Sequence, residues 1–97
     1  MLEKVKLAMR IGTDVFDSEL LDLIAAGIAD LMHIGVRFDY TFTSTDYTID
    51  DPLASRAVVT YCRMNFGSPA DYDRLKAAYD EMKGQLRESF AYGMEAL

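Results

Sequence analysis

The sequence predicts an all-α fold, a small bundle of about four helices with a β-hairpin-like or extended insertion between the second and third helices. Apolar residues recur every three or four positions in four segments, and Pro, Gly, Ser and Asp stand at the segment ends. Apolar and polar residues alternate over residues 36–43, which predicts the insertion. We expect one domain over residues 1–97, with residues 36–50 as an arm and residues 88–97 as a flexible tail.

The first two helices are predicted over residues 2–9 and 17–34. Their apolar faces are Leu2, Val5 and Met9 in the first, and Leu20, Leu21, Ile24, Ile28, Leu31 and Met32 in the second. Candidate N-caps of the second helix are Thr13, Asp14 and Asp17. The first helix should stop at Gly12, and Gly35 fits the left-handed end of the second. Gly27 would let another backbone approach the apolar face.

The arm is predicted to be a strand, a turn and a shorter returning strand. The turn contains Ser44, Thr45 and Asp46, and the returning strand covers residues 47–49. We expect the apolar side of the alternating strand to be buried. A lone hairpin is marginal in water, so the arm should lean on the helices or pair with a neighbouring chain. It should be the most mobile element.

The last two helices carry the clearest end signals. Those of the third helix, residues 52–66, are Asp51 as N-cap, Pro52 at the first position and Gly67 at the end. Those of the fourth are Ser68 as N-cap, Pro69 at the first position and Asp71 as an approximate capping box. The apolar stripe of the fourth helix, suited to one partner helix, is Tyr72, Leu75, Tyr79, Met82 and Leu86.

The third helix is apolar on almost every side, so either the other helices enclose it or other copies of the chain do. Only Arg56 and Arg63 share a polar line along it. One interpretation pairs these arginines internally with Asp22, Asp30 or an acid of the last helix. A second pairs them with acids of an adjacent subunit. DNA contact ranks third, because two charges in an acidic protein supply little affinity.

Composition excludes several functions. The net charge of −6 makes free nucleic acid and anionic membranes poor partners. No apolar run is long enough to span a bilayer, and the first residues do not form a signal peptide, so we expect a cytosolic chain. The single Cys62 makes no internal disulfide, and no Cys or His spacing fits a zinc site.

No residues form a convincing catalytic, cofactor or metal site. His33, with Asp30 three residues earlier, is interpreted as a solvated side chain rather than a general base. Cys62 is interpreted as a buried small hydrophobe, since no second histidine could activate it. The acids near the arm lack the spacing and glycine of a calcium loop, and they are expected to serve turns and caps. These acids are Asp46, Asp50 and Asp51.

The aromatic residues of the arm and tail have two interpretations. They could cover the core, or they could contact a neighbouring chain. Together with Arg56 and Arg63, the candidate interface residues are Phe38, Tyr40, Phe42 and Tyr47 in the arm, and Phe90 and Tyr92 in the tail.

Several segments in combination resemble the tailed-phage head–tail connector (adaptor) family of small DNA-packaging or head-completion proteins. The segments are Leu2-Glu-Lys-Val-Lys-Leu-Ala-Met-Arg-Ile11, Thr13-Asp-Val-Phe-Asp17 with Glu19, Leu23-Ile-Ala-Ala26, Asp51-Pro-Leu53, Ala57-Val-Val-Thr-Tyr61 and Asn65-Phe-Gly67. The resemblance leaves out the arm and the residues after Arg87. It implies a homo-oligomeric ring beneath the portal of a phage or prophage capsid, with no catalysis and no cofactor.

The partners implied are the portal protein on one side of the ring and a tail-joining or stopper protein on the other. DNA would pass through the channel without specific binding, and no membrane would be involved. The chain would reside at the head–tail junction of the virion, and in the host bacterial cytoplasm during assembly. The competing class is a small helical protein- or peptide-binding regulatory module that uses the groove beside the last helix. A hydrolytic enzyme is a third and weaker class.

Overall fold

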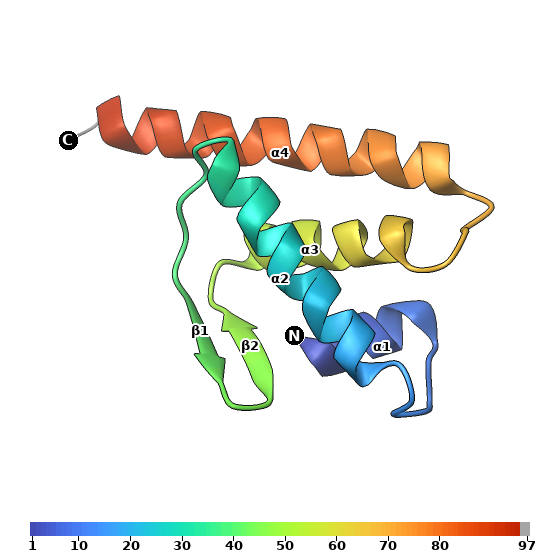
Figure 1. The fold of residues 1–97 in the computed structure, drawn as a ribbon. Helices are drawn as coiled ribbons and strands as arrows, with labels where there is room; N and C mark the ends of the chain where they lie inside the picture. The colour runs from blue at the N-terminus through green and yellow to red at the C-terminus, as the bar shows by residue number, and fades with distance from the viewer. Residues whose placement is uncertain (96–97) are drawn as a thin grey trace.

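In the computed structural model, four helices and one antiparallel hairpin follow one another along the chain (Figure 1). The elements are α1 (Leu2–Met9), α2 (Asp17–His33), β1 (Tyr40–Thr43), β2 (Asp46–Ile49), α3 (Pro52–Asn65) and α4 (Tyr72–Glu95). The structure describes the backbone of residues 1–95 and the side chains of residues 1–88. The fold is mostly helical rather than purely all-α, because residues 40–49 form a true two-stranded sheet.

Helix α3 lies at the centre and contacts α1, α2, α4 and β2. Its residues Ala54, Ala57, Val58 and Cys62 have no exposed surface. Burying a side chain the size of valine stabilises the fold by about 1.5–3 kcal/mol, so the burial of Val58 helps to hold this helix in the core. Most of the apolar surface of α3 is therefore enclosed by the other elements of the same chain rather than by other copies. Leu53 is the large apolar exception on this helix, at 46% exposed.

Gly27 fixes how closely α2 and α3 approach. A Cβ atom built at Gly27 would lie 3.1 Å from Cδ1 of Tyr61, tighter than ordinary van der Waals contact. The neighbour is thus an aromatic side chain, whereas the sequence predicted a backbone. The glycine still serves a packing purpose, because a Cβ at this position would require the Tyr61 ring to move by a few tenths of an ångström.

The starts of the helices follow the sequence only in part. Asp51 caps α3 as predicted, since its Oδ1 accepts hydrogen bonds from the N–H groups of Leu53 (2.8 Å) and Ala54 (3.0 Å). Helix α4 begins at Tyr72 instead of Pro69, because the preceding residues are used to reverse the chain direction after α3. Gly67 takes the left-handed conformation there, with φ of 66°.

The cap predicted for α2 is wrong. Its N-cap is Phe16, and no side chain bonds to the free N–H groups. The reason is Lys6 of α1, whose ammonium draws Asp14 (2.7 Å) and Asp17 (3.0 Å) into ion pairs. Lys6 is only 8% exposed, and a cation that is largely removed from water requires such partners. Tertiary pairing therefore overrides local capping.

The hairpin is confirmed, and it leans on the helices. Phe42 pairs with Tyr47 and Tyr40 with Ile49, which places these four side chains on one face. Ile49 is buried, but Tyr40 is 40% and Phe42 56% exposed, so the expected burial of the β1 side is wrong. The hairpin lies to one side of the helices, with its tip level with the link between α1 and α2, and β2 provides contacts to α2 and α3 (Figure 1).

Asp46 fastens the hairpin to the beginning of α1. Its Oδ1 accepts hydrogen bonds from the N–H groups of Leu2 (3.0 Å) and Tyr47 (2.7 Å). The amino group of Met1 donates to Oδ2 of Asp46 (3.3 Å) and to the carbonyl oxygen of Tyr47 (2.8 Å). These contacts join segments that lie more than forty residues apart in the sequence.

Helix α4 packs along α3 through the predicted stripe. Leu75, Tyr79 and Leu86 are buried and Met82 is partly buried, whereas Tyr72 is 40% exposed. The helix continues through Glu95, so most of the segment predicted as a tail is helical in its backbone. The side chains of the tail candidates Phe90 and Tyr92 lie outside the described residues. Among the described residues, no helix is both long and apolar enough to cross a membrane.

Candidate interaction surface

The predicted arginine line is present on α3, and its internal pairing is not. Arg56 is exposed, Arg63 is partly buried, and neither forms an ion pair within the described side chains. Asp30, one of the acids proposed as a partner, is engaged elsewhere. It accepts a hydrogen bond from the hydroxyl of Tyr79 (2.5 Å), and its Oδ2 lies 3.8 Å from the Lys83 ammonium.

Tyr79 holds α4 against α2 through this bond. Its side chain is almost wholly buried, its ring contacts Tyr61, and the Lys83 ammonium lies 4.8 Å from its centroid. Burial, and then the hydrogen bond to Asp30, raise the pKa of the Tyr79 hydroxyl well above its usual value. The phenol therefore stays protonated and donates at physiological pH, as a structural bond between helices.

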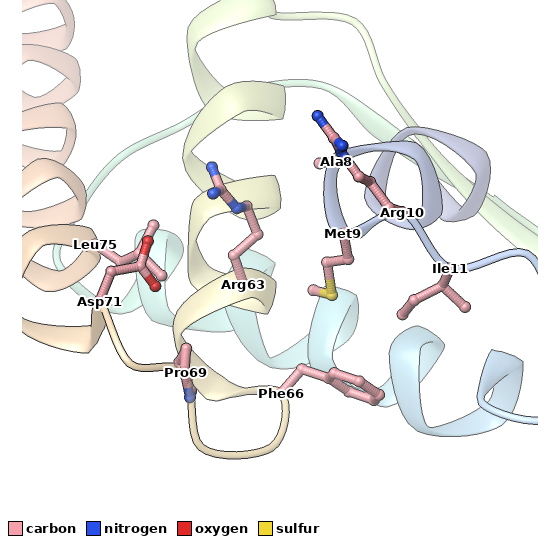
Figure 2. A pocket seen from close by; sticks show the side chains of 9 residues that line it. All are labelled: Ala8, Met9, Arg10, Ile11, Arg63, Phe66, Pro69, Asp71 and Leu75. Carbon is pink, nitrogen blue, oxygen red and sulfur yellow. The ribbon is translucent and has the colours of Figure 1, made fainter.

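Two hollows adjoin the arginine line and share Arg63 and Leu75 as lining residues. The first, about 310 Å³, lies between the end of α1 and the link from α3 to α4 (Figure 2). The second, about 420 Å³, lies between α3 and α4 and includes Arg56. We call this continuous surface the arginine groove, defined by Arg10, Arg56, Arg63, Phe66, Leu75 and Met82.

Arg10 is the member of the groove that the sequence analysis missed. It ends α1 in the left-handed conformation, with φ of 57° and ψ of 41°, and its N–H bonds to the carbonyl oxygen of Leu7. It is the one residue other than glycine with positive φ in the described part of the chain. Glycine is the usual residue at such an end, and the sequence signal for a stop was Gly12, which lies two residues later. The Arg10 side chain is exposed and lines the first hollow (Figure 2).

The arginines in and beside the groove differ in whether an acidic side chain pairs with them. Arg74, at its edge, donates to Oδ2 of Asp71 at 2.7 Å. This bond is the main reason that the pKa of Asp71 is lowered, and Arg63 adds a smaller electrostatic contribution. Figure 2 shows Arg63 between Asp71 and Leu75 on one side and Met9 and Arg10 on the other. Arg10, Arg56 and Arg63 have no ion pair within the described side chains.

The aromatic candidates of the arm lie together, apart from the arginine groove. Phe42 contacts Tyr47 with ring centroids 4.5 Å apart, and Tyr40 lies 6.4 Å from Tyr47 and 6.0 Å from Phe38. Tyr40 and Tyr47 also line a hollow of about 460 Å³ against α2. The structure thus brings four arm candidates into one cluster, and places the two arginines in another.

The cysteine, histidine and acids considered for catalysis or metal binding do not come together in one site among the described residues. Cys62 is buried, and burial raises the pKa of its thiol to about 12, so it is not a thiolate at neutral pH. His33 is exposed near the end of α2. Asp46 and Asp51 serve the hairpin and a helix cap, as expected. Among the described side chains, no group of three or more His, Cys, Asp or Glu residues could hold a metal ion.

Comparison with protein families gives one match that covers nearly the whole chain. The family model described as "Phage connector protein" matches residues 1–93, including the hairpin that the sequence resemblance left out. No curated protein and no solved structure matches the chain. The resemblance to phage head–tail connectors is confirmed, and the chain belongs to the phage connector protein family.

Proposed function

We propose that the chain is a structural, non-enzymatic subunit of a phage head–tail connector, and that its copies form a closed ring that docks on the portal protein. The ring would extend the DNA channel toward the tail and offer a platform to a tail-joining or stopper protein. The observation that carries this proposal is the family match over residues 1–93. The chain would then reside at the head–tail junction of the virion.

Two surfaces support a role in assembly. The arginine groove combines apolar walls with cations that form no ion pair among the described side chains, and the arm exposes the rings of Tyr40 and Phe42. Arginine and aromatic side chains are enriched in protein–protein contacts, where they supply much of the binding energy. A subunit with two such surfaces on different elements can contact more than one neighbour at a time.

The charge of the chain also suits a DNA channel. Sixteen acids against ten Lys and Arg leave a net charge of −6. A negative surface repels the phosphate backbone, so DNA would pass without specific binding. We assign no DNA-contacting residue.

Electron microscopy and native mass spectrometry of the chain, alone and with the portal protein of the same phage, test the proposal. We expect ring particles of one copy number in the presence of the portal. A chain that remains a strict monomer and ignores the portal would contradict the proposed function. Monomers in the absence of the portal would agree with it when rings form on the portal, since a connector can assemble on its partner.

The groove between α3 and α4 favours one alternative, a helical protein- or peptide-binding regulatory module. This hollow lies beside the last helix, and apolar and cationic residues line it together. Such a module would be a small, discrete oligomer that binds a helical peptide tightly. Titration calorimetry with acidic helical peptides distinguishes the two functions: tight binding without any ring or portal association would favour the module.

A further inference from the structure

The arginine groove lies on the side of α3 that faces away from α2. Tyr61, which packs on Gly27 of α2, marks the opposite side. At 3.6 residues per turn, Tyr61 lies about 140–160° around the helix from Arg56 and Arg63. Along the middle of α3 the groove and helix α2 thus lie on different sides of this helix, whereas at its end the groove residue Phe66 contacts Phe16 at the start of α2, with ring centroids 5.3 Å apart.

The outer side of α2 carries two acids without partners. Glu19 and Asp22 are exposed, lie one turn apart, and form no ion pair within the described side chains. Asp22 lies about 140° around α2 from Gly27, and so points away from α3. We call Ser18, Glu19 and Asp22, which are all exposed, the acidic ridge.

The ridge and the groove are complementary in charge. Guanidinium groups pair well with carboxylates, and they do so best where apolar walls exclude water. The groove supplies such walls through Phe66, Leu75 and Met82. Within the same subunit no ion pair among the described side chains joins the ridge to the groove. Glu81, an acid of α4 seven residues after Arg74, does not neutralise the groove either. It is exposed and forms no ion pair among the described side chains.

We propose that the acidic ridge of one copy docks into the arginine groove of a second copy. This inference rests on the proposed ring and names the contact that builds it. The two surfaces consist of different residues with opposite charge, so the contact is head-to-tail and can repeat from copy to copy. A rotation between copies that closes gives a ring. Arg10, at one end of the groove, adds a third cation for the incoming carboxylates.

Charge reversal on each surface, followed by reversal of both, tests this contact. The groove variant carries Arg56→Glu and Arg63→Glu, and the ridge variant carries Glu19→Arg and Asp22→Arg. Each should lose the rings that the wild-type chain forms with the portal protein, because like charges would then face one another. The combined variant restores opposite charges and should regain the rings. Native mass spectrometry and electron microscopy on the full chain give the readout.

A matched control separates this contact from a general charge effect. Lys4→Glu with Arg87→Glu changes the net charge as much as the groove variant does, at exposed positions of α1 and α4 outside both surfaces. This control should retain the rings. Circular dichroism melts verify folding of each variant. If the groove variant does not fold, Arg56→Gln with Arg63→Gln takes its place and should still lose the rings.

The outcomes separate the inference from the proposed function. Rings formed by both the wild-type chain and the groove variant would overturn the inference and leave the connector role standing. Loss of rings in the groove variant and in the ridge variant, without their recovery in the combined variant, would also overturn the inference. Another occupant, such as an acidic segment of the portal, would then fill the groove. A wild-type chain that never forms rings would contradict the proposed function itself.

Discussion

At the residue level, one short polar side chain decides where the chain leaves irregular structure and enters the central helix. Asp51 does so for α3 with two hydrogen bonds to free N–H groups, and Pro52 follows at a position where its missing N–H costs nothing. The adjacent Asp50 is exposed and makes no such bond with its side chain. Of these two neighbouring acids, only Asp51 therefore caps the helix.

The first prediction compares these two acids. Asp51→Ala should lower the free energy of unfolding by about 1 kcal/mol, because two N–H groups at the start of the central helix lose their acceptor. For a domain of this size that corresponds to a fall in Tm of about 4–8 °C. Asp50→Ala is the control and should leave Tm nearly unchanged. Equal effects of the two substitutions in thermal melts would contradict the capping role.

At the element level, one cation connects α1 to the start of α2. The Lys6 ammonium bonds to Asp14 and Asp17, which raises the pKa of Lys6 and lowers that of Asp14. Because the folded-state pKa of Asp14 lies below its ordinary value of 3.8, its contribution is complete above that pH and is lost as pH falls through the folded pKa. The contribution of Lys6 is complete below its ordinary value of 10.5 and is lost at still higher pH.

The second prediction follows from this pairing. Tm of the wild-type chain should fall more steeply with acidification below about pH 4 than Tm of Lys6→Met, which cannot form the pair. Lys4→Met serves as the control, because Lys4 is exposed and forms no ion pair within the described side chains. The measurement is a series of melts between about pH 2 and pH 7. Parallel pH profiles for all three chains would show that the pair does not contribute.

The sequence predicts the elements well and their contacts poorly, for a physical reason. Local signals predicted both ends of α3, since Asp51 precedes the helix and Gly67 follows it in the structure as well. The cap of α2 failed because Lys6, eleven residues before Asp17, competes for the capping acids. Arg10 gave no local signal, since the usual mark of a left-handed end is glycine and its place in the groove depends on how α1 packs beside α3.

At the level of the whole molecule, the candidate surfaces fall on separate parts of the bundle. The arginine pair was singled out in the sequence as an interface candidate, and its internal ion pairs are absent among the described side chains, where Asp30 contacts Tyr79 and Lys83 instead. The aromatic cluster was predicted as a set, yet only the structure shows how far Phe42 stands out at 56% exposed. An exposed ring on a projecting hairpin suits contact with another chain.

The third prediction concerns this ring. Phe42→Ser should lower the free energy of unfolding by no more than about 1 kcal/mol, because the side chain is 56% exposed and loses mainly its cross-strand contact with Tyr47. It should nevertheless weaken association with the portal or with other copies, measured by native mass spectrometry. Thr41→Ser, on the opposite face of β1, is the control and should associate like the wild-type chain. Unchanged association of Phe42→Ser would remove the arm tip from the set of interface candidates.

The close contact between Gly27 and Tyr61 has a geometric consequence for a closed ring. It brings α2 and α3 close together, and in the proposed ring the span across these two helices would be the width of one subunit along the circumference. For a fixed number of copies, that width determines the diameter of the central opening. The missing side chain of Gly27 would thus contribute to the size of the opening in the proposed ring.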